Sequence, residues 1–291
     1  MMLAAIRTTC SLLKLRIGVA IAASALAGMV AGKDVSPGFG QIVILLIAVL
    51  GASGAAGAFN HYYERELDRR MARTRSRPFA SGRLQPSAWW PVAFAILLVA
   101  SLLLAAAAGG LLSSLFVFLG AFTYGIVYTV WLKRQSVWNI VIGGLAGSFA
   151  VLAGAAAVGS SLEPFPIALA IVLFLWTPPH FWSLAAAKRE DYAAAGIPML
   201  PGVTSQPVWT SAILLHTLAL VAISLVPLWY GQGWAYGVCA TIGGVWFLWK
   251  SLLLFLAPGQ RTAMANFFAS LIQLTLLILG VGLDYLARYV G

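Results

Sequence analysis

The sequence predicts an all-α polytopic membrane protein, with about nine transmembrane helices around a central cavity and a cytoplasmic N-terminus. Three observations lead to this prediction. Hydrophobic residues make up 61% of the chain and charged residues only 9%, unlike soluble globular proteins. Apolar stretches of about twenty residues, long enough to cross a bilayer as helices, recur along the chain. Lysines and arginines gather at alternate ends of these stretches.

Nine apolar stretches have the length expected of a transmembrane helix. They cover residues 16–32, 38–58, 89–109, 112–131, 139–158, 164–184, 209–230, 233–256 and 264–285. Glycines alone mark two of the boundaries, Gly109 and Gly110 after the third stretch and Gly231 and Gly233 after the seventh. Either place is also compatible with a re-entrant break. No long hydrophilic domain, linker or low-complexity tail appears in the chain, so we expect one transmembrane domain over residues 1–291.

The basic residues predict the orientation of the helices. If the N-terminus is cytoplasmic, every lysine and arginine except Lys33 and Arg288 lies at a cytoplasmic end, as the positive-inside rule requires. The net charge of +10 then reflects topology, and its spread over several loops excludes a nucleic-acid partner. Cleavage of the first stretch as a signal peptide would reverse this bias, so we expect it to be retained. The segment before this stretch is too short for a typical organelle transit sequence. We therefore expect the protein to lie in the lipid bilayer of a bacterial inner membrane.

The segment at residues 60–78 is the most informative polar part of the chain, because it follows an apolar stretch directly. Asn60, Glu64 and Asp68 recur at every fourth residue, and this spacing places them on one face of a helix. Amide and carboxylate oxygens on one face suit Mg²⁺, which needs only one or two protein carboxylates when phosphates and water complete its shell. The arginines that follow are placed to hold such phosphates. Acids at the end of a membrane helix are also costly and tend to be functional.

Two sizeable polar loops, near residues 60–88 and 185–208, fall on the predicted cytoplasmic side. Each follows an even-numbered apolar stretch and carries acids next to bases; in the second loop, Glu190 and Asp191 follow directly on a lysine and an arginine. We expect the two loops to close over a shared cavity.

These residues also have less specific interpretations. Juxtamembrane arginines and lysines often serve as topology signals or contact lipid headgroups. A lone histidine near a helix end, such as His180, is often a hydrogen-bonded structural group. Glu66 points away from the acidic face, and we expect it to be the solvated partner of Arg70.

Four motifs in the first two hundred residues resemble those of the UbiA-type intramembrane prenyltransferases. The first is the acidic face described above, with the arginine-rich run that follows it. The others are the segments at 128–144, 176–182 (Trp-Thr-Pro-Pro-His-Phe-Trp) and 191–201. The last two resemble the branch of the family that farnesylates heme. The remaining ninety residues resemble the family in hydropathy only.

The resemblance implies a reaction, in which the farnesyl group of farnesyl diphosphate is transferred to a vinyl group of heme b (a substrate, not a cofactor) to give heme O and diphosphate. It also implies the roles of individual residues. The Mg²⁺ ligands are Glu64, Asp68 and Asp191, oriented by Asn60. The diphosphate ligands are Arg73, Arg77, Lys133 and Arg134. The contacts with the allylic cation are Tyr124 and Tyr128, and the heme contact is His180. A downstream heme-modifying enzyme or a terminal oxidase is implied as a partner.

The sequence departs from the family pattern at two places. Glu64 stands where the family often has aspartate, which changes the geometry at a metal. Ala150 and Val151 stand where many members have a proline pair, which affects the shape of the cavity near the fifth apolar stretch.

Two other functions stay open at this point. A prenyltransferase of the quinone or chlorophyll pathways shares the fold and the first motif but takes a different aromatic acceptor. A small-molecule transporter is the alternative from another class. Transporters place polar residues near the bilayer midplane on broken helices, whereas the acids of this chain cluster at predicted cytoplasmic ends.

Overall fold

The structure is a computed structural model that describes residues 2–32 and 36–290, with side chains over 6–32 and 36–288. The described residues form helices joined by turns and loops, with no strand among them, which confirms the predicted all-α class. The longer helices are α2 (Leu15–Val30), α3 (Phe39–Tyr63), α5 (Trp89–Phe122), α7 (Leu145–Ala157), α8 (Pro164–Ala187), α11 (Gln206–Leu225), α12 (Trp234–Leu256) and α13 (Gln260–Val290). The short elements are α1 (Met2–Leu12), α4 (Arg65–Arg69), η1 (Thr123–Leu132), α6 (Asn139–Gly143), α9 (Arg189–Ala194), α10 (Leu200–Val203) and η2 (Val226–Tyr230).

The number of membrane spans depends on how two elements are counted. Within the described residues, seven helices are long and apolar enough to cross a membrane, or up to eight if the bent pair α1 and α2 forms one span. Residues 89–132 form one of the seven, although the sequence predicts two spans there. The count of nine and the cytoplasmic N-terminus therefore stay predictions, and the predicted outer position of Lys33 lies outside the described residues.

Gly110 reverses the chain inside this long element. Its backbone has φ 75° and ψ −177°, a conformation that glycine adopts readily. Across the reversal, the Ser114 hydroxyl donates to the Leu102 carbonyl at 2.8 Å. In a straight helix these two residues would lie about 18 Å apart along the axis. The two parts of α5 therefore run antiparallel, and the reversal coincides with the span boundary predicted at Gly109 and Gly110.

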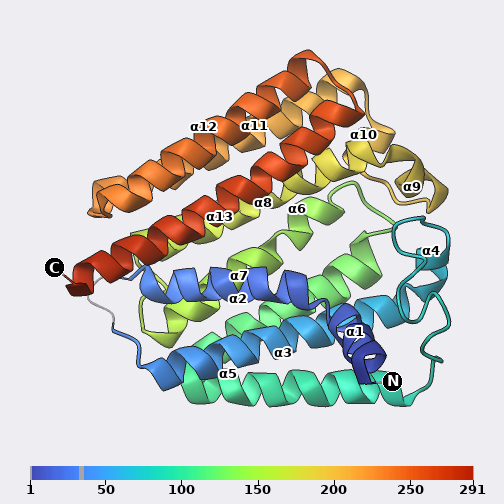
Figure 1. The fold of residues 1–291 in the computed structure, drawn as a ribbon, viewed down its shortest axis with the longest axis horizontal. Coiled ribbons are helices and arrows are strands. Elements are labelled where there is room, and N and C mark those ends of the chain that lie inside the picture. Colours follow the sequence, from blue (N-terminus) through green and yellow to red (C-terminus); the bar gives the residue numbers. More distant parts are fainter. Residues whose placement is uncertain (1, 33–35, 291) are drawn as a thin grey trace.

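The helices pack into a bundle in which the last helix, α13, returns to the end of α2. In succession, α2 packs on α3, α3 on α5, α5 on α7 and α7 on α8, and α13 packs on both α8 and α2. The N-terminal half fills the lower part of Figure 1 and the C-terminal half fills the upper part. Arg288 near the end of α13 donates to the carbonyls of Val30 and Gly32 at the end of α2. These contacts join the two halves around their shared apolar core.

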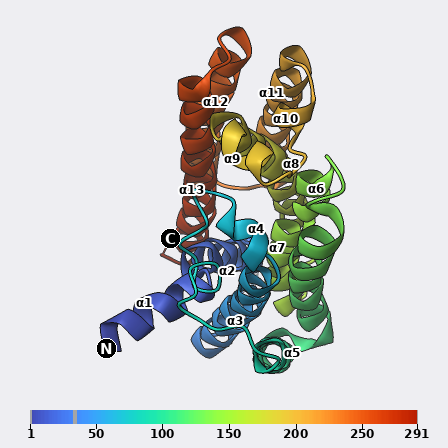
Figure 2. The same ribbon diagram turned by 90° about the vertical axis from the view of Figure 1, so that its right-hand side faces the viewer.

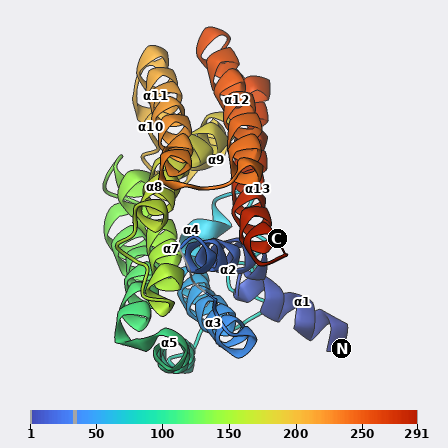
Figure 3. The ribbon, with the colours of Figure 1, turned by 90° about the vertical axis from the view of Figure 1, so that its left-hand side faces the viewer.

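One end of the bundle carries α4, α9 and α10, the helices of the two predicted cytoplasmic loops (Figures 1 and 2). The loops are shorter than predicted, because α3 continues to Tyr63, α8 continues to Ala187 and α11 begins at Gln206. Leu67 of the first loop shares a hydrophobic cluster with Ile197 of the second. The two loops therefore pack on one another, while α1 projects away from the bundle (Figures 2 and 3).

Two glycines allow α2 and α7 to cross with their backbones in contact. A Cβ atom on Gly28 would lie 2.0 Å from the Val151 carbonyl oxygen, and one on Gly154 would lie 1.7 Å from the Ala25 carbonyl oxygen. Ala150 and Val151, which stand at the family's proline pair, are helical and buried in α7. The departure from the proline pair therefore keeps α7 regular where it meets α2.

We expect Gly154→Ala to lower the free energy of unfolding by about 1–3 kcal/mol. The added methyl group would overlap the backbone of Ala25 on α2. Thermal unfolding of the detergent-solubilised protein measures this loss. Gly40→Ala is the matched control, since nothing lies within 4 Å of a Cβ atom at that position. Equal melting temperatures for the two variants would contradict the close crossing.

Candidate active site at the loop end of the bundle

The predicted acidic face spans the junction between α3 and α4. The Glu64 amide donates to the Asn60 carbonyl at 2.9 Å, and the Asp68 amide donates to the Glu64 carbonyl at 2.8 Å. This helical spacing continues across the break at Glu64, so the three side chains stay on one face. All three residues are buried, with at most 1% of their surface exposed. The apolar bundle therefore encloses an amide and two carboxylates.

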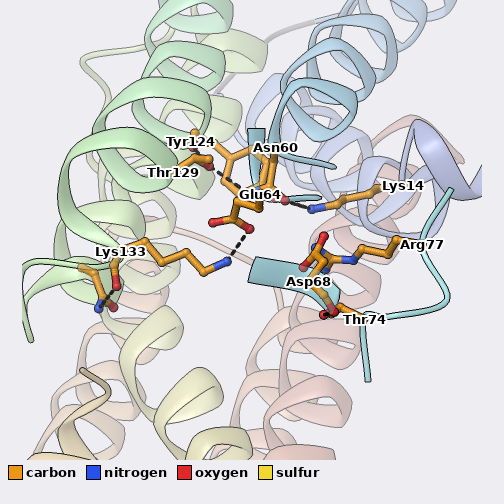
Figure 4. Close-up of polar contacts among 10 residues, drawn as sticks. Lys14, Asn60, Glu64, Asp68, Thr74, Arg77, Tyr124, Thr129 and Lys133 are labelled. Atoms are coloured by element: carbon orange, nitrogen blue, oxygen red, sulfur yellow. Dashed lines mark hydrogen bonds and ion pairs between the residues drawn. The ribbon is translucent and has the colours of Figure 1, made fainter. Parts of the chain in front are cut away.

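Both carboxylates are paired with cations from other parts of the chain (Figure 4). Lys133 Nζ, just after η1, lies 2.5 Å from Glu64 Oε2. Arg77 Nη1, on the loop after α4, lies 2.9 Å from each carboxylate oxygen of Asp68. Burial lowers the pKa of Lys133 below its usual range, and the Glu64 carboxylate opposes that shift. Such pairing is what makes buried charges tolerable.

Asn60 connects three elements through its side-chain amide. Its Oδ1 accepts a hydrogen bond from Lys14 Nζ at 2.6 Å, and its Nδ2 donates to Thr129 Oγ1 at 3.0 Å. Thr129 in turn donates to the Tyr124 carbonyl at 2.8 Å. The amide thus holds the start of α2 and the middle of η1 against the end of α3.

The π-helix η1 places two tyrosines beside this cluster. The Tyr124 and Tyr128 rings stack with their centroids 5.8 Å apart and their planes 14° apart. Lys14 Nζ lies 5.3 Å from the Tyr124 centroid, and Lys133 Nζ lies 5.6 Å from the Tyr128 centroid. A Cβ atom on Gly143 would lie 3.0 Å from the Tyr128 ring, so this glycine makes room for the ring. π-Helical segments are rare and frequently occur at functional sites.

Arg73, Arg134 and Asp191 lie further out than the buried cluster. Arg73 is exposed and lies close to the side chain of Tyr192 on α9. Burial raises the pKa of Tyr192, and the guanidinium of Arg73 opposes that shift. Arg134 is exposed, with its guanidinium carbon 5.9 Å from the ring centroid of Tyr63. Within the described residues, neither Arg134 nor Asp191 makes a hydrogen bond or ion pair with the cluster.

His180 lies in an aromatic stack between α8 and α13. Its Nδ1 is 2.7 Å from the Ser270 hydroxyl, and its ring stacks on Trp176 at 4.1 Å and on Phe267 at 4.5 Å. Its heme contact stays a prediction.

The two buried carboxylates fit a divalent cation in one respect. Glu64 Oε1 is buried and has no hydrogen-bond partner, and an unpaired buried carboxylate oxygen of this kind calls for a ligand. However, no three of the described acids, histidines and cysteines come together as a metal site. The three-carboxylate site of Glu64, Asp68 and Asp191 therefore stays a prediction.

The structure adds residues to the predicted site and corrects one expectation. Lys14 and Thr129 both hold Asn60, but the sequence suggests only a topological role for Lys14 and none for Thr129. Glu66 pairs with Arg69 Nη1 at 2.8 Å, so the expected pairing with Arg70 is wrong. Helix α4 ends at Arg69, so Arg69 keeps the helical position three residues from Glu66, whereas Arg70 lies beyond the last residue of the helix.

A bundle of membrane-length helices that buries paired acids and bases at one end defines a helical membrane protein with a charged internal site. The chain belongs to the UbiA prenyltransferase family, whose model matches residues 21–272, as the motifs indicate. It is 54% identical over 280 residues to protoheme IX farnesyltransferase 2 of Paramagnetospirillum magneticum, covering 96% of this chain and 97% of that protein.

Two solved structures share the fold. The structure of digeranylgeranylglyceryl phosphate synthase in membranes has a TM-score of 0.79 at 17% identity, covering 96% of this chain and 98% of that one. A UbiA homologue from Archaeoglobus fulgidus bound to GPP and Mg²⁺ has a TM-score of 0.62 at 13% identity, covering 94% and 99%. At these identities the likeness shows the fold alone.

We expect Glu64→Gln and Lys133→Met each to destabilise the protein by about 3–5 kcal/mol, because either change leaves one buried charge without its partner. The double variant should recover much of that loss. Unfolding measurements on the two single variants and the double variant give the coupling between the residues. Glu66→Gln is the control, since its pair with Arg69 is exposed and should be worth less than about 1 kcal/mol. Additive losses in the double variant would show that the buried pair is not coupled.

Proposed function

We propose that this chain transfers the farnesyl group of farnesyl diphosphate to a vinyl group of heme b, giving heme O and diphosphate, in a Mg²⁺-dependent reaction. The observation that supports this most directly is the buried cluster of acids and bases, in a chain more than half identical to a protoheme IX farnesyltransferase. Its carboxylates suit a metal, its cations suit a diphosphate, and the apolar bundle suits a prenyl chain.

The ion pairs define how the cluster receives a charged substrate. Arg77 and Lys133 are held by Asp68 and Glu64 in this structure. A diphosphate that arrives with a divalent cation offers each group a new partner, because the carboxylates bind the metal and the cations bind phosphate oxygens. Glu64 and Asp68, with Asp191 from α9, would hold the Mg²⁺, which when bound withdraws charge from the leaving diphosphate.

The residues around the cluster support ionisation of the prenyl substrate. The bond between C1 of the farnesyl group and the diphosphate oxygen breaks, and its electron pair leaves with the oxygen. Arg77 and Lys133, with Arg73 and Arg134 at the outer edge, stabilise the charge that grows on the diphosphate. The rings of Tyr124 and Tyr128 stabilise the allylic cation through their π faces. The terminal carbon of the heme vinyl group then forms the new C–C bond, and water adds to the neighbouring carbon and releases a proton.

Further parts of the proposal concern the setting of the enzyme. We infer that the whole chain acts as one transmembrane domain in a bacterial inner membrane, with α4 and α9 facing the cytoplasm. His180 contacts the heme from its aromatic stack. A heme-modifying enzyme or a terminal oxidase then uses the product.

We expect membranes that contain this chain to convert heme b to a hydroxyethylfarnesyl heme when farnesyl diphosphate and Mg²⁺ are supplied. Mass spectrometry of the extracted hemes detects this product. Chelation of the metal should abolish the product, and added Mg²⁺ should restore it. Glu64→Ala/Asp68→Ala is the inactive control. Prenylation of an aromatic acid offered in parallel, with heme b unchanged, would instead indicate an aromatic prenyltransferase, and reaction of neither acceptor would favour a transporter.

We expect Arg77→Ala to lower kcat by about 10²–10³-fold, the usual effect of removing a donor that stabilises charge in the transition state. Arg134→Ala should change kcat less than about tenfold, because its side chain is exposed and lies against Tyr63. Steady-state kinetics with farnesyl diphosphate as the varied substrate compare the two variants. Similar losses in both would contradict the inner position of Arg77.

A further inference from the structure

Lys14 occupies a strained position at the bend between α1 and α2. Its backbone has φ 49° and ψ 42°, and no other described non-glycine residue has a positive φ. The two helices are bent by 55° at this point. A left-handed lysine costs about 1–2 kcal/mol, and such strain persists only where the surroundings hold it in place.

The contacts of the Lys14 side chain explain why this bend is held. Its Nζ lies 2.6 Å from both Asn60 Oδ1 and the Tyr124 hydroxyl (Figure 4). A Cβ atom on Gly57 would lie 3.3 Å from Lys14 Cδ, so the glycine on α3 leaves room for the lysine stem. The bend therefore delivers an ammonium group to the cluster from a segment far away in the sequence.

The charges around Lys14 leave this ammonium without a carboxylate of its own. Both of its hydrogen-bond partners are neutral, and among the described residues it makes no ion pair. Glu64 and Asp68 lie within electrostatic range, as do Arg77 and Lys133, but each of these acids is paired with one of those bases. Three basic side chains thus surround two carboxylates. Because bases outnumber acids in this buried cluster, it is suited to receive an anion.

We propose that Lys14 is a third inner cation, beside Arg77 and Lys133, for the diphosphate of the prenyl substrate; this inference rests on the proposed function of the site. When the diphosphate arrives, the ammonium moves its hydrogen bonds from the neutral oxygens of Asn60 and Tyr124 to phosphate oxygens. It donates hydrogen bonds only and transfers no proton. The move also releases the Asn60 amide oxygen and the Tyr124 hydroxyl inside the cluster.

Lys14→Asn tests this role with little change to the backbone, because asparagine tolerates the left-handed conformation better than most residues. We expect KM for farnesyl diphosphate to rise about tenfold or more, the loss typical of a charge-assisted hydrogen bond. KM for heme b should change less than about twofold. Lys14→Arg keeps the charge and should recover most of the affinity for farnesyl diphosphate. Arg16→Asn is the matched control, since it removes an exposed cation two residues away.

Binding of inorganic pyrophosphate tests the same role without catalysis. Pyrophosphate with Mg²⁺ should raise the melting temperature of the wild type and of Arg16→Asn, and Lys14→Asn should need about tenfold more pyrophosphate for the same rise. Inorganic phosphate should give a much smaller rise, which separates a diphosphate site from a general phosphate or lipid-headgroup site. The melting temperature is measured on the protein that is folded at the start, so a lower yield of folded variant does not affect the comparison.

The two experiments separate the possible outcomes. If Lys14→Asn lowers the melting temperature but responds to pyrophosphate like the wild type, Lys14 is only a structural link and the proposal fails. It also fails if Arg16→Asn loses as much affinity as Lys14→Asn. Absence of a heme product in the wild type would overturn the proposed function, whereas the pyrophosphate response would still test Lys14.

Discussion

The requirement that a carboxylate buried among apolar helices be neutralised by a cation organises the loop end of this protein. Glu64 and Asp68 are almost fully enclosed, and an unpaired charge in such surroundings is strongly destabilising. Their cations come from different parts of the chain, Lys133 from the end of η1 and Arg77 from the loop after α4. Each pair therefore also helps to fix the position of the segment that supplies the cation.

The neutral contacts extend this organisation to the N-terminus. Asn60 carries no charge, yet it joins Lys14 and Thr129 and thereby ties the bend before α2 to η1. On the other side of the cluster, the proximity of Arg73 to Tyr192 and the hydrophobic cluster shared by Leu67 and Ile197 join the two loops. The same residues that suit a charged substrate thus also hold separate segments of the helical bundle together.

The sequence predicts the parts of this structure that depend on local patterns. Apolar length predicts the helices, and four-residue spacing predicts the shared face of Asn60, Glu64 and Asp68. Features that depend on tertiary contacts cannot be predicted from the sequence in this way. Neither glycine nor proline marks the bend at Lys14, whose strained backbone is held by partners 46 and 110 residues away. The partner of Glu66 and the π-helical form of η1 likewise depend on packing that local propensity does not determine.

The reversal at Gly110 has a consequence for how the protein is made. The antiparallel parts of α5 are joined at a single glycine, with alanine, glycine and leucine on either side. No polar loop has to be carried to the far side of the bilayer at this point. If one part of α5 entered the membrane alone, the other part, which is also apolar, would stay in water. The two parts are therefore suited to enter the membrane in one step as a preformed hairpin, which presents η1 and its tyrosines to α3 as soon as the hairpin is in place.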